Sequence, residues 1–194
     1  MFIRQSNPGS VPPTPWGALF LATFMMTLAG HAAGDSPIRS INVTYDGETY
    51  FCDAVMFAPV PLAVAWEVLT DFDHMAEWVP NVRESKVLKR EGNSTMIEQR
   101  GLAKFGAASF PYVTERHIEM NSPTTIRSTQ AKGSLRKVES LMTLEPDGKS
   151  TRLKYHLEIV PSLLASAVMS KSFLEHELAE QFTAIVGEMT RRTR

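Results

Sequence analysis

The sequence predicts an α+β fold in which a curved antiparallel sheet wraps around one long C-terminal helix. Turn signals recur at short intervals between alternating segments, residues 58–82 have the pattern of two short helices, and residues 163–192 contain an apolar stripe at helical spacing. Closely spaced turns favour an antiparallel meander, and the apolar face of such a sheet must be covered by another layer. The long helix is the layer that this sheet can grip.

The first two strands flank a hairpin signal. Ile41, Val43 and Tyr45 alternate with polar residues, Asp46-Gly47 follows, and the alternation resumes at Tyr50. Asp-Gly between two alternating segments predicts a tight β-turn. Further strands are predicted at 83–90, 95–102, 110–120, 125–130, 135–144 and 152–160.

Two short helices are predicted after these first strands. Pro61 suits the first turn of a helix because its missing N–H has no partner there. Asp71 and Asp73, in a titratable cluster with His74, are expected to cap the second helix and form the turn between the two. Pro80 ends the pair, since the residue before a proline avoids the helical region.

One apolar stripe predicts a single helix from about residue 163 to residue 192. The stripe consists of Leu174, Leu178, Phe182, Ile185 and Met189, at steps of three or four residues. At 100° per residue these positions fall within a sector of about 80°. We therefore expect this face to lie against the sheet.

The N-terminus has the pattern of a secretory signal peptide. Arg4 is the only charged residue before Asp35, and an apolar segment at 16–28 is followed by small residues. An apolar segment of this length is short for a membrane span and typical of a signal peptide. We therefore predict a signal peptide at 1–34 and one domain at 35–194. An uncleaved N-terminal anchor is the alternative.

Charge and cysteine content exclude several classes of protein. The chain has 20 basic and 21 acidic residues, and losing Arg4 with the signal peptide changes its net charge from −1 to −2. Such a balance offers no general attraction for nucleic acid. Cys52 is the only cysteine, so no internal disulfide can form, and its strand-like surroundings predict a buried, inert thiol.

Sequence motifs for catalysis and metal binding are absent. The chain has no GxSxG, Walker A or GxGxxG motif. Four histidines follow residue 34, and none has a second ligand at metal-binding spacing. We therefore predict no catalytic residues, no metal and no cofactor.

The strand at 95–102 leaves two arrangements open. If Ile97 and Gln99 face inward, the interior contains an amide; if their neighbours do, it contains the carboxylate of Glu98. We favour the amide. Glu98, Glu115 and Arg116 are candidates for a buried ion pair.

Aromatic side chains from several predicted elements converge on one space. A filled core is the simplest interpretation, but a deeply curved sheet that closes on one helix favours a mostly apolar pocket. The candidate ligand-binding residues are Trp78, Gln99, Phe110, Tyr112, Tyr155, Leu174, Leu178 and Phe182.

Residues 58–82 also resemble a known family. They contain Ala-Pro-Val at 58–60, Ala-Trp-Glu-Val-Leu-Thr-Asp-Phe at 65–72 and Val-Pro-Asn-Val at 79–82. This block resembles the polyketide cyclase/dehydrase and coenzyme Q-binding branch of the START-like (SRPBCC) superfamily, over about residues 40–192. The resemblance implies a helix-grip fold that holds a hydrophobic ligand between sheet and helix. No iron–sulfur ligand set is present, which excludes the oxygenase branch.

These observations predict a periplasmic or secreted START-like protein that binds a lipid-like, quinone-like or polycyclic ligand without catalysis. The alternative is a cyclase or aromatase for a polyketide-like substrate, in which Tyr112, Gln99 or Asp73 orients and protonates the substrate. A third hypothesis is an envelope module that binds protein through its sheet edge. The expected partners are a small hydrophobic ligand and, transiently, a membrane.

Overall fold

A computed structural model describes residues 36–194, so the predicted signal peptide lies outside the described residues. The strands are β1 (Ile38–Tyr45), β2 (Tyr50–Ala58), β3 (Val82–Glu91), β4 (Ser94–Phe105), β5 (Ala108–Asn121), β6 (Thr125–Gly133), β7 (Lys137–Asp147) and β8 (Ser150–Val160). The helices are α1 (Leu62–Thr70), the 3₁₀ helix η1 (Phe72–Glu77), α2 (Leu163–Ser166) and α3 (Lys171–Arg191). No helix within the described residues has the length and apolarity needed to cross a membrane.

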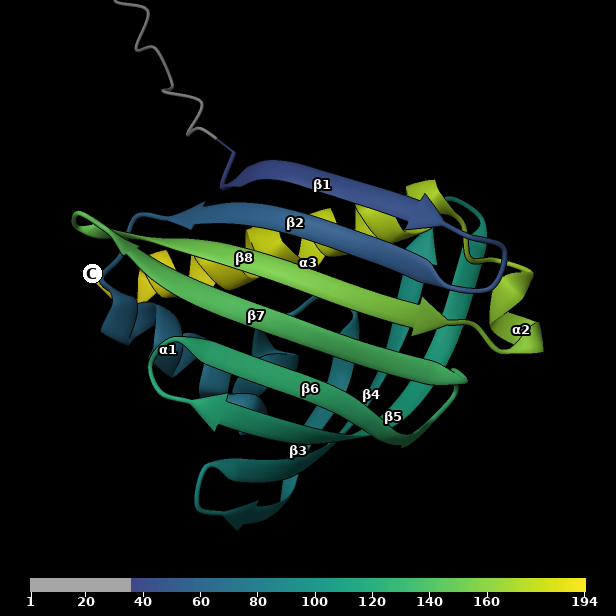
Figure 1. Ribbon diagram of the computed structural model, residues 1–194, viewed down its shortest axis with the longest axis horizontal. Helices are drawn as coiled ribbons and strands as arrows, with labels where there is room; N and C mark the ends of the chain where they lie inside the picture. The colour runs from purple at the N-terminus through teal and green to yellow at the C-terminus, as the bar shows by residue number, and fades with distance from the viewer. Residues whose placement is uncertain (1–35) are drawn as a thin grey trace, which may run out of the picture. The chain divides into compact units, whose positions relative to one another are not determined.

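The eight strands form one antiparallel sheet in the order β1-β2-β8-β7-β6-β5-β4-β3. The sheet curves around α3, which contacts β1 and β2 near one edge and β4 near the other (Figure 1). The predicted architecture, a curved antiparallel sheet around a long C-terminal helix, is therefore confirmed.

Alternation along the strands explains the concave apolar face. Cys52, Ala54 and Met56 of β2 are buried, and they stand opposite Leu157, Tyr155 and Leu153 of β8. Side chains at every second position share one face of a sheet, so paired strands in this register cover the same side of α3. Burial raises the pKa of the Cys52 thiol to about 12, which keeps it protonated.

The residues between α1 and η1 differ from the prediction. Neither helix receives a side-chain cap. Instead Asp71 binds Arg192 beyond α3, and Asp73 Oδ1 accepts a hydrogen bond of 2.8 Å from the Val87 backbone N–H of β3. The predicted capping role was wrong because long-range partners engage both carboxylates.

The predicted single C-terminal helix is divided in two. Helix α2 ends at Ser166, and α3 begins at Lys171. Ser162 and Ser170 accept hydrogen bonds from the backbone N–H groups of Ala165 and Phe173, so each helix starts with its own serine cap.

The end of α3 is fastened to α1 and η1 by charged side chains. Arg192 donates to Glu188 at 2.8 Å, to Glu67 at 3.1 Å and to Asp71 at 2.6 Å. Asp71 also contacts His74 Nδ1 at 2.5 Å. Hydrogen bonds from Arg191 and Arg192 outweigh the effect of burial and lower the pKa of Glu188 to about 2. We call Glu67, Asp71, Glu188 and Arg192 the Arg192 cluster.

Candidate functional site

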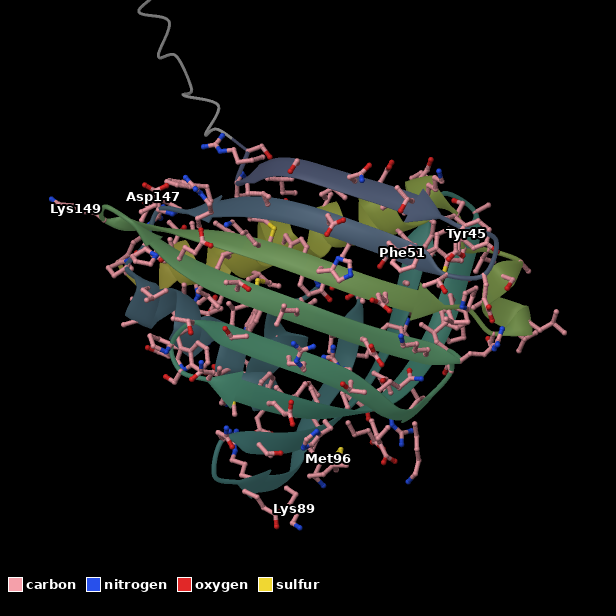
Figure 2. All side chains as sticks on the ribbon, viewed as in Figure 1. Tyr45, Phe51, Lys89, Met96, Asp147 and Lys149 are labelled. Atoms are coloured by element: carbon pink, nitrogen blue, oxygen red, sulfur yellow. The ribbon has the colours of Figure 1, made fainter. Side chains whose placement is uncertain are left out.

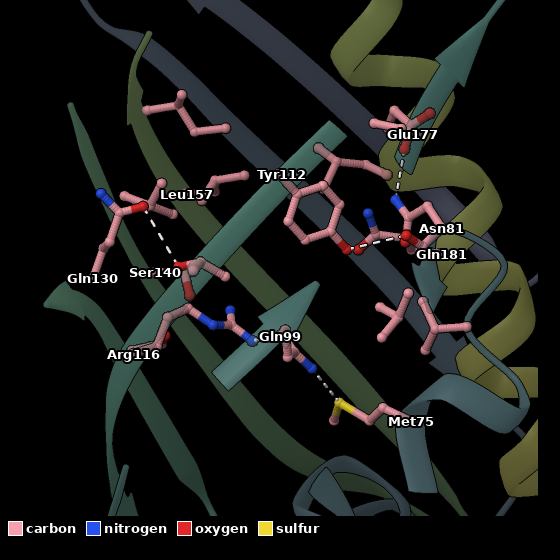
Figure 3. A pocket seen from close by; sticks show the side chains of 18 of the residues that line it. Met75, Asn81, Gln99, Tyr112, Arg116, Gln130, Ser140, Leu157, Glu177 and Gln181 are labelled. Carbon is pink, nitrogen blue, oxygen red and sulfur yellow. Dashed lines mark hydrogen bonds between the residues drawn. The ribbon is translucent and has the colours of Figure 1, made fainter. Parts of the chain in front are cut away.

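A cavity of about 270 Å³ lies between the concave face of the sheet, η1 and α3. Its walls come from α1, η1, β3 to β8 and α3, with Met169 from the segment that joins α2 to α3 (Figure 3). These elements meet because the sheet curves around α3 and the pair α1 and η1 covers the remaining side.

Most of the lining is apolar. Helix α3 contributes Leu174, Leu178, Phe182 and Ile185, which belong to the stripe seen in the sequence. The ring of Phe182 packs edge-on against that of Tyr155, with 5.1 Å between the ring centroids. Such a wall suits a ligand with a hydrocarbon or aromatic body.

Arg116 of β5 is the cation of this cavity. Its Nη2 donates a hydrogen bond of 2.6 Å to Gln99 Oε1, while its Nε is buried without a partner among the described residues. No carboxylate in the described chain forms an ion pair with it. Desolvation lowers the pKa of Arg116 from its usual value, and the nearby Tyr155 and Tyr112 only partly oppose this effect.

Gln99 holds Arg116 through a short chain of hydrogen bonds. Its Nε2 donates to Ser85 Oγ at 3.0 Å and to Met75 Sδ at 3.3 Å. With its nitrogen occupied by β3 and η1, the amide presents its oxygen to the guanidinium. One side of Arg116 is thus fixed by the protein, and the other faces the cavity (Figure 3).

Two further polar atoms of the lining lack partners. Ser128 Oγ and Asn81 Oδ1 are buried and make no hydrogen bond with the described residues. Buried polar groups in proteins are nearly always paired, so such atoms around one cavity indicate where polar atoms of a ligand can bind.

Glu177 of α3 is the centre of a second set of polar contacts. Glu177 accepts hydrogen bonds from Asn81 Nδ2 at 2.6 Å and from the Lys104 backbone N–H at 2.7 Å. The Tyr112 hydroxyl donates to the Asn81 carbonyl oxygen at 3.2 Å. Gly101 makes this approach possible, because a Cβ there would overlap both Asn81 and Tyr112.

Burial sets the protonation of these groups. Desolvation raises the pKa of Glu177 above its usual value, against the lowering effect of its two hydrogen bonds. Desolvation also raises the pKa of Tyr112 to about 12, so its hydroxyl stays protonated at physiological pH. Tyr112 can therefore donate a hydrogen bond but cannot readily act as a base.

Seven of the eight candidate ligand-binding residues line the cavity: Gln99, Phe110, Tyr112, Tyr155, Leu174, Leu178 and Phe182. Trp78 does not. The cavity-facing residues of its segment are Phe72, Met75 and Val79. The Trp78 side chain instead packs against the core, and its buried indole N–H has no partner among the described residues. The structure therefore does not place Trp78 in the cavity lining as predicted, because the 3₁₀ turn presents a different face.

The structure decides between the two arrangements that the sequence left open for β4. Ile97 and Gln99 are buried, so the interior contains the amide. The expected buried ion pair was wrong: Glu98 pairs with Arg100, and Glu115 pairs with Lys132. Both acids lie on the opposite face of the sheet from Arg116, as the two-residue period of a strand requires.

The sequence interpretation missed Asn81, Ser128 and Glu177. The position of Glu177 could have indicated that it is buried, because on the helix it lies about 60° from Leu174, beside the apolar stripe. None of the described histidines lines the cavity, and no described cluster of three or more potential ligands could hold a metal ion.

Solved structures share this architecture. The Zhui aromatase/cyclase from Streptomyces sp. R1128 matches at 15% identity, with 75% of this chain and 96% of that chain covered and a TM-score of 0.63. A START superfamily protein from Mycobacterium smegmatis matches at 16% identity, over 73% and 97% of the two chains, with a TM-score of 0.63. A STAR-related lipid transfer protein from Xanthomonas axonopodis matches at 15% identity, over 77% and 98%, with a TM-score of 0.57.

At these identities the similarity establishes the fold alone and confirms the predicted helix-grip, START-like architecture. No curated protein matches the chain. The sequence profile described as "Polyketide cyclase / dehydrase and lipid transport" matches residues 53–191, which include η1, the whole cavity wall and α3. The chain therefore belongs to the polyketide cyclase/dehydrase and lipid transport family.

Proposed function

We propose that this protein binds a hydrophobic ligand that carries a negatively charged oxygen group, with the apolar body along α3 and the oxygens at Arg116. A lipid-like acid or an acidic polycycle fits this description. A quinone-like molecule fits less well, because it would offer Arg116 only neutral carbonyl oxygens.

The guanidinium of Arg116 is the observation that carries this proposal. A cation inside a protein is costly unless it is paired and hydrogen-bonded, and within residues 36–194 Arg116 has one amide oxygen and no acid beside it. An anionic oxygen in the cavity would supply the missing charge and accept a hydrogen bond from Nε. Ser128 Oγ and Asn81 Oδ1 line the same space and can bind further polar atoms of the ligand.

The size of the cavity limits the ligand. At about 270 Å³ it lies just below the range of about 300–1,000 Å³ for small-molecule sites. This supports a single hydrocarbon chain or a compact ring system rather than a two-chain phospholipid.

A cyclase or aromatase activity is the second candidate. Tyr112, Arg116 and Glu177 bring three titratable groups with shifted pKa values to one cavity, a pattern found at catalytic sites. Tyr112 could donate a hydrogen bond to a substrate carbonyl in place of its bond to the Asn81 carbonyl oxygen, and Arg116 could stabilise an enolate. Asp73, the third residue considered from the sequence, is exposed and does not line the cavity.

We also propose that the protein is exported to the periplasm or secreted, with residues 1–34 removed. The support is the apolar segment at 16–28 and the small residues after it. Mass measurement of the exported protein tests this, and an intact N-terminus would contradict it.

Two dyes test the ligand proposal directly. Anilinonaphthalene sulfonate carries an anionic group on an aromatic body, and phenylnaphthylamine has nearly the same body without the charge. The protein should bind the sulfonate at least about tenfold more tightly, since a charge-assisted hydrogen bond contributes about 1.5–3 kcal/mol. Arg116→Met should remove this preference and leave the affinity for the neutral dye unchanged.

A matched pair of variants on α3 tests whether the dyes occupy the cavity. Leu178→Trp should abolish the binding of both dyes because Leu178 lines the cavity. Glu180→Trp, on the exposed side of the same helix, should bind both dyes as the unaltered protein does. Equal affinity for the two dyes, or full binding by Leu178→Trp, would contradict the proposal. Conversion of a polyketide-like substrate by the unaltered protein would establish the enzymatic alternative.

A further inference from the structure

Five of the six exposed large apolar side chains in the described chain belong to segments at one end of the molecule. The five are Tyr45, Phe105, Val113, Leu163 and Leu164; the sixth is Leu88 on β3. We call these five residues the α2 end.

Hydrogen bonds bring the segments of the α2 end together. The Arg136 backbone N–H donates to the Val160 carbonyl at 3.0 Å, which places the β6–β7 connection beside the strand end that leads into α2. The Ser134 backbone N–H of that connection donates to the Val113 carbonyl at 2.9 Å.

Aromatic contacts and the views of the molecule complete this placement. The Phe105 ring lies 4.8 Å from the ring of His176, near the start of α3. Figure 1 shows α2 beyond the end of β8, and Figure 2 shows Tyr45 at this same end and Asp147 and Lys149 at the opposite end.

Helix α2 presents two leucines to solvent. Leu163 is 90% exposed and Leu164 is 80% exposed, whereas Ala165 is fully buried and anchors the helix. The segment 161–174 contains no acidic residue and one basic residue, Lys171. A protruding apolar turn without acidic side chains can enter a bilayer interface without burying a carboxylate.

The α2 end also borders the cavity. Met169, which follows α2, and Leu174, in the first turns of α3, both line it, as do Phe110 and Leu135. The Tyr50 hydroxyl donates to the Met169 carbonyl at 3.1 Å, which fixes this segment against β2. A surface in contact with the α2 end would therefore lie close to the cavity.

We propose that the α2 end docks on a lipid surface, with Leu163 and Leu164 inserted among the lipids. Lys104 and Lys171 flank the apolar side chains and form no ion pair with described residues, so they can meet anionic headgroups. This inference goes beyond the proposed ligand, because the inserted side chains, Leu163 and Leu164, do not line the cavity.

A local fluorescent reporter tests the docking in the full chain. Leu164→Cys is labelled with an environment-sensitive thiol dye; Cys52 will not react, because it is buried and its pKa is raised to about 12. Leu88→Cys is the matched control, since Leu88 is exposed on β3, away from the α2 end. The probe is a set of vesicles made of phosphatidylethanolamine with phosphatidylglycerol. Because the dye reports its own surroundings, binding of the apolar segment at 16–28 to vesicles cannot imitate the result.

The dye at position 164 should shift to shorter wavelength with vesicles, and the dye at position 88 should not. Adding Leu163→Ser to the Leu164→Cys protein should weaken the response about tenfold, because it removes one inserted apolar side chain. Removal of phosphatidylglycerol or addition of salt should weaken it further.

No shift at position 164, or equal shifts at positions 164 and 88, would overturn the docking proposal. A shift at position 164 that appears without vesicles when the protein concentration is raised would identify a second copy of the chain as the occupant. That result would also overturn the docking proposal. Dye binding in the cavity is measured separately without vesicles. If insertion at position 164 occurs but the cavity binds neither naphthalene dye, the docking stands and the proposed ligand fails.

Discussion

Arg192 and Arg116 are two arginines held largely away from bulk water, and their surroundings differ completely. Arg192, 18% exposed, donates to three carboxylates in the Arg192 cluster. Arg116 donates to one amide and has no acid beside it in the described chain. The first arginine is fully satisfied by the fold. Arg116 keeps an uncompensated charge and a buried Nε–H donor without a partner among the described residues. For this reason we propose that it binds a ligand.

The largest expected effect is the loss of stability in Arg192→Met. The change removes the one side chain that bridges Glu188, Asp71 and Glu67, and removing one partner of a buried pair costs about 3 kcal/mol or more. Urea unfolding measures it. Arg191→Met is the control, because Arg191 also donates to Glu188 but is 71% exposed and should cost less than about 1 kcal/mol. Equal losses in the two variants would mean that the cluster does not depend on Arg192.

The dependence of stability on acid pH should also distinguish the Arg192 cluster from Arg116. The pKa of Glu188 is lowered from 4.5 to about 2 in the folded protein. Its contribution to stability is thus complete above about pH 4.5 and disappears as the pH falls towards 2. Glu188→Gln should reduce the difference in unfolding free energy between neutral and acid pH by about 2–3 kcal/mol. Arg116→Met should leave that difference unchanged, because no acid pairs with Arg116; an altered acid profile in Arg116→Met would contradict this.

The smallest expected effect has the opposite sign. Arg116→Met removes an uncompensated cation and keeps an unbranched stem, so the ligand-free protein should be unchanged or more stable by roughly 1 kcal/mol. The measurement is urea unfolding after organic extraction of any bound ligand. A loss above about 1 kcal/mol would show that Arg116 serves the fold rather than a ligand.

Periodicity accounts for what could be predicted. The two-residue period of strands placed Phe110, Tyr112 and Tyr155 on the inner face, and the helical period placed Leu178 and Phe182 against the sheet. These assignments depend only on which face is apolar, and the local sequence states this directly.

Partners far apart in the sequence account for what could not be predicted. Asp71 suits a helix cap by its position, but Arg192 lies 121 residues away and takes its carboxylate. Glu177 faces Asn81 across 96 residues. Nothing in a local pattern identifies such pairs. The division between α2 and α3, by contrast, could have been predicted, because Ser162 and Ser170 are recognisable helix caps. The prediction followed the apolar stripe and did not use these two serines.

The pairing of β2 with β8 sets the order in which this chain can fold. Tyr50 pairs with Ile159 and Ala58 with Thr151, so these two neighbouring strands join segments about 100 residues apart. Closing so long a loop costs entropy before any contact compensates, and proteins rich in such contacts fold slowly. The apolar face of β2 must therefore wait, uncovered, until almost the whole chain is available. Such a delay would leave the chain unfolded during the export proposed above.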